Sequence, residues 1–129
     1  MEKKAKILLI DDDPDFIEAT KTVLETNPYE VIVAHDGDEG LRKAKEENPD
    51  LILLDVIMPV KDGFTAAEQI KKDPQLSQIP VLMLTSYAQK RSGTAIPVSR
   101  GLTLEAEDYI EKPVTPEDLL MMVAQYLKG

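Results

Sequence analysis

The chain has 129 residues, 43% of them hydrophobic and 30% charged, a length and composition that predict one globular domain over residues 1–129. The net charge of −9 argues against direct binding to nucleic acid or to an anionic membrane surface. Without cysteine and with one histidine, His35, the chain lacks the residues for disulfides, zinc thiolates, thiol catalysis or a His-pair metal site. The apolar run Ile7–Ile10 is too short for a signal peptide or a membrane span. We therefore expect a cytoplasmic protein.

The first element is a strand over Lys6–Ile10, whose unbroken apolar run is typical of a strand buried on both faces. It leads into Asp11–Asp13, and Pro14 then suits the first turn of a helix. Asp13 is better explained as the cap of this helix than as a metal ligand. The apolar face of this helix is formed by residues at helical spacing: Phe16, Ile17, Thr20, Val23 and Leu24. Asn27 and Pro28 end the helix.

The middle of the chain alternates strands and helices. Tyr29–Ala34 predicts a strand, and Asp36–Glu47 predicts a helix with a charged outer face. Four apolar residues, Leu51–Leu54, then form a buried strand that ends at the carboxylate of Asp55. An acid at this end of a buried strand lies where open α/β sheets place their ligand chemistry. The next helix is expected over Gly63–Lys72.

Two more strands and a last helix are expected in the second half. Val81–Leu84 is a buried strand that ends in Thr85 and Ser86, and Tyr109–Ile110 is a short strand leading to Lys112. The last helix begins at Thr115–Asp118, a cap followed by proline and acids. We expect its inward face to carry Leu119, Leu120, Val123 and Leu127, with Met121 and Met122 also packed in the core.

The segment Gln89–Ala106 fits this alternation poorly. A fourth helix is expected there, but Gly93, Pro97 and Gly101 interrupt it, and proline costs about 3 kcal/mol in a helix interior. We predict a short or irregular helix and a mobile loop. The fold class is nevertheless clear: a doubly wound α/β domain with a five-stranded parallel sheet.

Side chains with chemistry follow four of these strands. They are Asp11–Asp13, Asp55, Thr85 with Ser86, and Lys112, and the carboxyl ends of parallel strands meet at one edge of a sheet. Clustered carboxylates raise each other's pKa values unless a cation joins them, and Mg²⁺ accepts such oxygen ligands. A carboxylate nucleophile beside a hydroxyl, an ammonium and a metal indicates phosphoryl transfer to an aspartate.

Over nearly its whole length the chain resembles the receiver domain of two-component response regulators. The resemblance rests on the acid cluster after the first strand and on the motifs LLDVIMPVKDG, LMLTS and DYIEKP, in this order. It implies a flavodoxin-like fold with strand order 2-1-3-4-5. It also implies a phosphoryl group donated by a histidine kinase or a phosphotransfer protein, and a downstream protein target. The oligomeric state stays open.

The resemblance also assigns the metal site and the phosphorylation site. Asp55 would be the phosphorylated residue and a ligand of Mg²⁺ or Mn²⁺. Asp12 would bind the metal directly, and Asp11 directly or through water. The backbone carbonyl of Ile57 would be a further ligand.

The remaining implied roles concern the phosphoryl group and the switch. Thr85 and Lys112 would each contact a phosphoryl oxygen, and Thr85 with Tyr109 would form the conformational switch. Two positions after Asp55 and Thr85 stand Ile57 and Tyr87, which are bulky and offer no group to orient an attacking water. Small Ser86 leaves the phosphoryl group room. We therefore expect slow self-dephosphorylation.

Two features depart from the family pattern. Thr85 and Lys112 are 27 positions apart, several more than is usual. The pair Glu105-Ala106 stands where the family commonly has Gly-Ala. Both departures fall on the face that most receivers use for output, so the usual dimer surface is in doubt while the acidic pocket is intact.

Two other functions are compatible with some of these residues. A small aspartate-nucleophile phosphatase of the haloacid dehalogenase type also uses Asp, Thr or Ser, Lys and Mg²⁺. Its nucleophile, however, follows the first strand and its additional acids come late, which is the reverse of the order here. A non-phosphorylated adaptor of the same fold is disfavoured by the intact acidic pocket.

Overall fold

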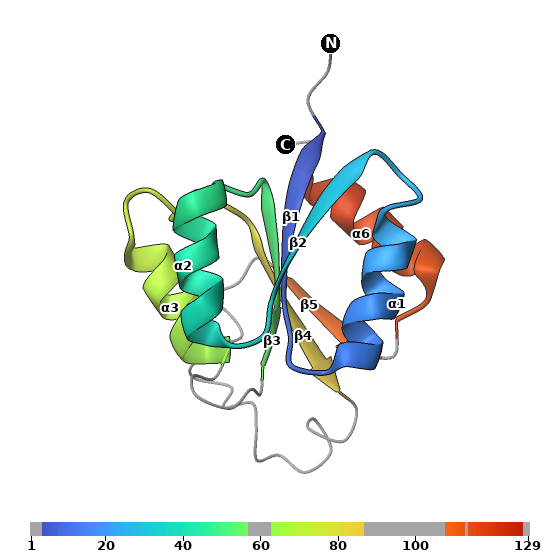
Figure 1. Ribbon diagram of the computed structural model, residues 1–129, viewed down its shortest axis with the longest axis horizontal. Coiled ribbons are helices and arrows are strands. Elements are labelled where there is room, and N and C mark those ends of the chain that lie inside the picture. The colour runs from blue at the N-terminus through green and yellow to red at the C-terminus, as the bar shows by residue number, and fades with distance from the viewer. Residues whose placement is uncertain (1–3, 57–62, 87–107, 113, 128–129) are drawn as a thin grey trace.

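A computed structural model describes residues 4–56, 63–86, 108–112 and 114–127 (Figure 1). Five strands in this part of the chain form one parallel sheet with the order β2-β1-β3-β4-β5. Both the predicted sheet and its strand order are confirmed. The strands are β1 Ala5–Ile10, β2 Tyr29–Ala34, β3 Leu51–Asp55, β4 Val81–Ser86 and β5 Asp108–Lys112.

Helices cover both faces of the sheet, as expected for a doubly wound domain. Figure 1 shows α2 and α3 on one face and α1 and α6 on the other, so the molecule has three layers. None of the helices in the described segments is long and apolar enough to cross a membrane. The bounds are α1 Pro14–Leu24, α2 Gly37–Glu47, α3 Gly63–Lys72 and α6 Pro116–Leu127.

The continuous apolar runs of the strands follow from these two helical layers. In β1, Ile7 and Leu9 pack in the core under α1 and α6, whereas Leu8 and Ile10 pack in the core under α2 and α3. Successive side chains of a strand point to opposite faces. Because both faces are covered, all four side chains are fully buried, and no polar residue alternates with them.

Short polar side chains begin α1, α2 and α6. The carboxylate of Asp13 accepts hydrogen bonds from two backbone N–H groups in the first turn of α1, at 3.0 and 3.4 Å, which confirms its predicted role as a cap. Asp36 accepts from the N–H of Glu39 at 2.8 Å, so α2 begins one residue later than predicted. At the start of α6, Thr115 accepts from the N–H of Asp118 at 3.1 Å.

Helix α2 approaches β1 closely because it carries Gly40 on its inner face. A Cβ atom at this position would clash with Cδ1 of Ile10 and lie 2.9 Å from its Cγ1. Ile10 is fully buried, so its side chain has little room to move away. The same helix ends at Asn48, which adopts a left-handed conformation with φ of 49° and so turns the chain toward β3.

Two expectations for the C-terminal part need correction. Strand β5 extends to Lys112 and is longer than the predicted two residues, because its whole length pairs with β4. Met121 is 63% exposed and therefore does not lie in the core. Met122 is partly buried and packs against the core. Leu119 and Val123 are the residues of α6 buried in the core, and Met121, midway between them, falls on the opposite side of a 3.6-residue helix. The predicted irregular helix in Gln89–Ala106 lies outside the described residues.

Candidate functional site

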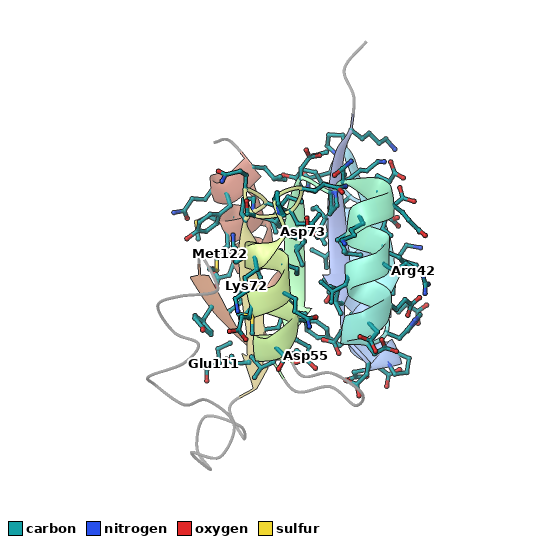
Figure 2. The ribbon with its side chains drawn as sticks, turned by 90° about the vertical axis from the view of Figure 1, so that its left-hand side faces the viewer. Arg42, Asp55, Lys72, Asp73, Glu111 and Met122 are labelled. Atoms are coloured by element: carbon teal, nitrogen blue, oxygen red, sulfur yellow. The ribbon has the colours of Figure 1, made fainter. Side chains whose placement is uncertain are left out.

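The carboxyl ends of β1 and β3 bring three carboxylates together. Ile10 and Leu54 are register partners, so the residues that follow them, Asp11 and Asp55, lie at the same edge of the sheet. Carboxylate oxygens of Asp11, Asp12 and Asp55 all lie within 4.8 Å of one another. Figure 2 shows Asp55 at this end of the sheet and Asp73, which follows α3, at the opposite end.

Asp11 and Asp12 differ in exposure although they are neighbours. Asp11 is fully buried, and its Oδ1 accepts a hydrogen bond from the N–H of Asp13 at 3.0 Å. The N–H of Asp11 in turn donates to the carbonyl of Ala34 at 3.0 Å. Asp12 is exposed. The cluster therefore combines a fixed inner carboxylate with an outer one that solvent and solutes can reach.

Lys112 supplies the positive charge of the site. Its Nζ lies 2.8 Å from Oδ2 of Asp11 and 3.5 Å from Oδ1 of Asp55. The lysine ends β5 and is paired in register with Ser86 of β4, so its side chain reaches across β4 to the acids. Only 18% of that side chain is exposed, and the interaction is therefore little weakened by solvent.

The electrostatic balance of the site favours an additional cation. Burial, and after it the nearby negative charge of Asp11, together raise the pKa of Asp55 from its ordinary value of 3.8 to about 7, although Lys112 opposes both effects. One ammonium thus offsets the charges of three carboxylates incompletely. A group that brings positive charge to this edge would favour ionised Asp55.

Thr85 lies beside Asp55 on the neighbouring strand. It follows Leu84, the register partner of Asp55, and is 3% exposed. The N–H of Val56 donates to the carbonyl of Leu84 at 3.0 Å, which holds the chain after Asp55 against β4. Thr85 is thus placed at the edge where the sequence predicted it.

Several predicted site residues fall outside the described part of the chain. Ile57 and Tyr87 belong to segments that the structure does not describe, and of Ser86 only the backbone is described. Their predicted roles stay predictions. Tyr109 is described: it pairs with Met83 in the sheet and packs, partly buried, on the core under α2 and α3.

Phe16 belongs to this site although the sequence assigned it only to the apolar face of its helix. Its ring centroid lies 4.2 Å from Nζ of Lys112, a distance typical of a cation–π contact. The two residues are far apart along the chain, so no local pattern indicates their contact. The only sequence signal is an aromatic residue in the first turn of a helix that directly follows an acid cluster.

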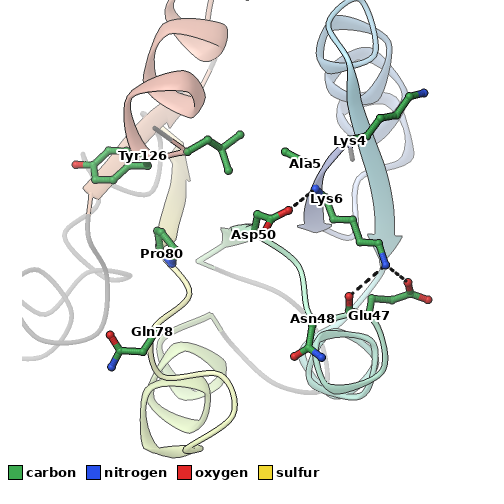
Figure 3. Close-up of a pocket in the computed structure, with 10 residues that line it drawn as sticks. Lys4, Ala5, Lys6, Glu47, Asn48, Asp50, Gln78, Pro80 and Tyr126 are labelled. Atoms are coloured by element: carbon green, nitrogen blue, oxygen red, sulfur yellow. Dashed lines mark hydrogen bonds and ion pairs between the residues drawn. The ribbon is translucent and has the colours of Figure 1, made fainter. Parts of the chain in front are cut away.

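A separate hollow of about 690 Å³ lies at the opposite, amino-terminal edge of the sheet (Figure 3). Lys6 closes one side through an ion pair with Glu47 at 3.2 Å and a hydrogen bond from its N–H to Asp50 at 2.8 Å. Lysines and acids line this hollow together. Open α/β sheets bind ligands at the carboxyl ends of their strands, and this hollow is at the other end.

Known proteins resemble this chain in sequence and in fold. Residues 7–124 match the model of the response regulator receiver domain family. PilH from Pseudomonas aeruginosa is 35% identical over 125 residues, and the match covers 97% of this chain and 99% of PilH. The alkaline phosphatase synthesis transcriptional regulatory protein PhoP from Bacillus subtilis is 37% identical over 123 residues, covering 95% of this chain and 48% of PhoP. The chain thus spans about half the length of PhoP and of other transcriptional regulators that it matches.

A solved structure extends the comparison to the fold. The receiver domain of a sensor histidine kinase from Pseudomonas aeruginosa, solved with a magnesium ion in its active-site cleft, has a TM-score of 0.86 and 25% identity, and the match covers 98% of this chain and 100% of that domain. None of these similarities supports the phosphatase alternative. The chain belongs to the response regulator receiver domain family, and it is a receiver domain of two-component signalling.

Proposed function

We propose that Asp55 is the residue of this receiver domain that becomes phosphorylated, in a reaction that depends on a divalent cation. The observation that carries the proposal is the setting of Asp55: a buried carboxylate at a strand end, 3.5 Å from Nζ of Lys112 and within 4.8 Å of two further acids. A merely structural acid would not need a second buried carboxylate, Asp11, at the end of the neighbouring strand β1 and the ammonium of Lys112 beside it.

The donor set fits Mg²⁺ or Mn²⁺. Asp11, Asp12 and Asp55 offer carboxylate oxygens, which hard cations prefer, and exposed Asp12 leaves a side open for water ligands. The raised pKa of Asp55 is consistent with a site that has too little positive charge of its own. When bound, the ion would neutralise charge on the carboxylates and on the phosphoryl oxygens. The carbonyl of Ile57 stays a predicted further ligand.

The residues of the chain would divide the transfer reaction among them. One oxygen of Asp55 attacks the phosphorus of the donor, the bond between phosphorus and the donor's leaving atom breaks, and its electron pair leaves with the donor. Lys112 pairs with one phosphoryl oxygen, and the Thr85 hydroxyl donates a hydrogen bond to another. These contacts stabilise charge where it develops, so the domain would catalyse its own phosphorylation and, more slowly, its dephosphorylation.

The partners are proposed on the same grounds. A histidine kinase or a phosphotransfer protein in the cytoplasm would donate the phosphoryl group, and a downstream protein would read the result. The new charge at Asp55 would bias a two-state element containing Thr85 and Tyr109. The single sheet, with one core on each face, favours one receiver domain over residues 1–129.

Incubation with acetyl phosphate and Mg²⁺, followed by intact mass measurement, tests this proposal. We expect one added phosphoryl group in the wild type, none in Asp55→Asn, and none in wild type with a chelator. Multiple turnover of a small phosphate ester would instead favour a phosphatase. Stoichiometric modification of Asp55→Asn would show that another residue accepts the group.

A further inference from the structure

Phe16 and the acid cluster contact the ammonium of Lys112 from different elements. Phe16 is the third residue of α1, and its ring centroid is 4.2 Å from Nζ. The same Nζ lies 2.8 Å from Asp11 and 3.5 Å from Asp55. The ammonium is thus attracted by carboxylate oxygens and by the negative face of an aromatic ring at once.

The start of α1 fixes the position of the ring. The N–H of Phe16 donates to Oδ1 of Asp13 at 3.4 Å, within the N-cap of the helix. Pro14 restricts the backbone of the same turn, and the Phe16 side chain packs partly buried on the core under α1 and α6. The ring is therefore held by the helix that follows the acid cluster, independently of Lys112.

A lysine side chain needs such a restraint more than the other groups of the site do. It has four rotatable bonds and keeps its ammonium in water where it can. Here only 18% of the Lys112 side chain is exposed, so the cation–π contact is largely desolvated and correspondingly strong.

We propose that Phe16 is a positioning residue, whose ring holds the Lys112 ammonium at the edge of the acid cluster where it can meet a phosphoryl oxygen on Asp55. The inference rests on the proposed function, because Lys112 has this task only if Asp55 is phosphorylated. The ring acts through its electrostatic face, so an aliphatic side chain of similar size does not replace it. Phe16 itself touches no reacting atom.

Three variants separate this role from packing. Phe16→Leu keeps an apolar side chain and removes the ring, Phe16→Tyr keeps the ring, and Val23→Ala removes apolar packing from the same helix and core. Val23 lies seven residues further on, about 10 Å along the helix axis. We expect Phe16→Leu to slow phosphorylation by acetyl phosphate about three- to tenfold at subsaturating donor. Phe16→Tyr and Val23→Ala should stay near the wild-type rate.

A measurement without metal or donor tests the contact directly. In the NMR spectrum of the metal-free protein, the Lys112 methylene protons next to the ring should be shifted upfield, and Phe16→Leu should abolish this shift while Val23→Ala retains it. Fluorinated phenylalanines placed only at position 16 weaken the ring's negative face and change its shape little. The phosphorylation rate should fall stepwise with each added fluorine.

The outcomes are distinguishable. A wild-type rate in Phe16→Leu, or a rate that does not vary along the fluorinated series, would overturn the positioning role while leaving the proposed function intact. No phosphorylation of the wild type would refute the proposed function itself. If Phe16→Leu does not fold, the fluorinated series alone decides, since those side chains fill the same space.

Discussion

Replacing Asp55 by asparagine should stabilise the metal-free protein, and more so as the pH rises. The folded-state pKa of Asp55 is raised from 3.8 to about 7, first by burial and then by the charge of Asp11. Between these values the folded state keeps a proton that the unfolded chain releases, so the stability of the wild type falls as the pH rises. Asparagine cannot ionise and escapes this loss.

The magnitude follows from the size of the shift. Three pKa units correspond to about 4 kcal/mol at 1.36 kcal/mol per unit, which is a ceiling because relaxation of the folded state and solvent around the ionised carboxylate lower the penalty. We expect the free energy of unfolding of Asp55→Asn to exceed that of the wild type by about 2 to 4 kcal/mol at pH 8. The difference should be much smaller at pH 5. Lys112 keeps its partner Asp11 in the variant, so no buried charge is left alone.

Urea unfolding at pH 5, 6, 7 and 8 with a chelator measures the difference. Glu18→Gln, which removes one exposed charge from α1, serves as the matched control and should show no comparable trend. Added Mg²⁺ should narrow the gap, because the ion stabilises ionised Asp55 and binds the folded state. If the free energies of unfolding of the wild type and Asp55→Asn differ by the same amount from pH 5 to 8, the reasoning is refuted.

Three further predictions concern the metal, the core and the lifetime of the signal. Asp12→Ala should lower Mg²⁺ affinity at least tenfold, about 1.4 kcal/mol, in a calorimetric titration, and equal affinities would remove Asp12 from the metal site. Gly40→Ala should cost about 1 kcal/mol of stability in urea unfolding, since overpacking against Ile10 exceeds the gain in helix propensity. Adding Ile10→Val should recover part of this loss, and no recovery would exclude the clash. Replacing Ile57 by Asn and Tyr87 by Ala should shorten the phosphorylated half-life about tenfold, and an unchanged half-life would show that neither residue shields the site.

The strands and helix starts were predictable because their signals are local. The runs Ile7–Ile10 and Leu51–Leu54 can be buried only in a sheet covered on both faces, and that burial is observed. Asp13 followed by proline predicts a capped helix start without knowledge of the rest of the fold. The site acids followed from the same logic, since parallel strands bring their carboxyl ends together.

The remaining features depend on contacts that no local pattern encodes. The contact of Lys112 with Asp11 requires the strand order, which only the resemblance supplied. The ring of Phe16 is adjacent because the first turn of α1 lies within reach of the Lys112 side chain from the end of β5. The sequence alone does not show why position 40 needs glycine, because the reason is its close contact with Ile10. Met121 was misplaced because α6 buries a narrower stripe than its apolar sequence suggests.

The most direct test of the account is to locate the phosphoryl group. The protein is incubated with acetyl phosphate and Mg²⁺, reduced with borohydride, which converts an acyl phosphate to an alcohol, and digested for peptide sequencing by mass spectrometry. The account predicts homoserine in place of aspartate at position 55 alone, dependent on both the donor and the cation. Homoserine at Asp11 or Asp12, or an unmodified Asp55 in a phosphorylated protein, would contradict it.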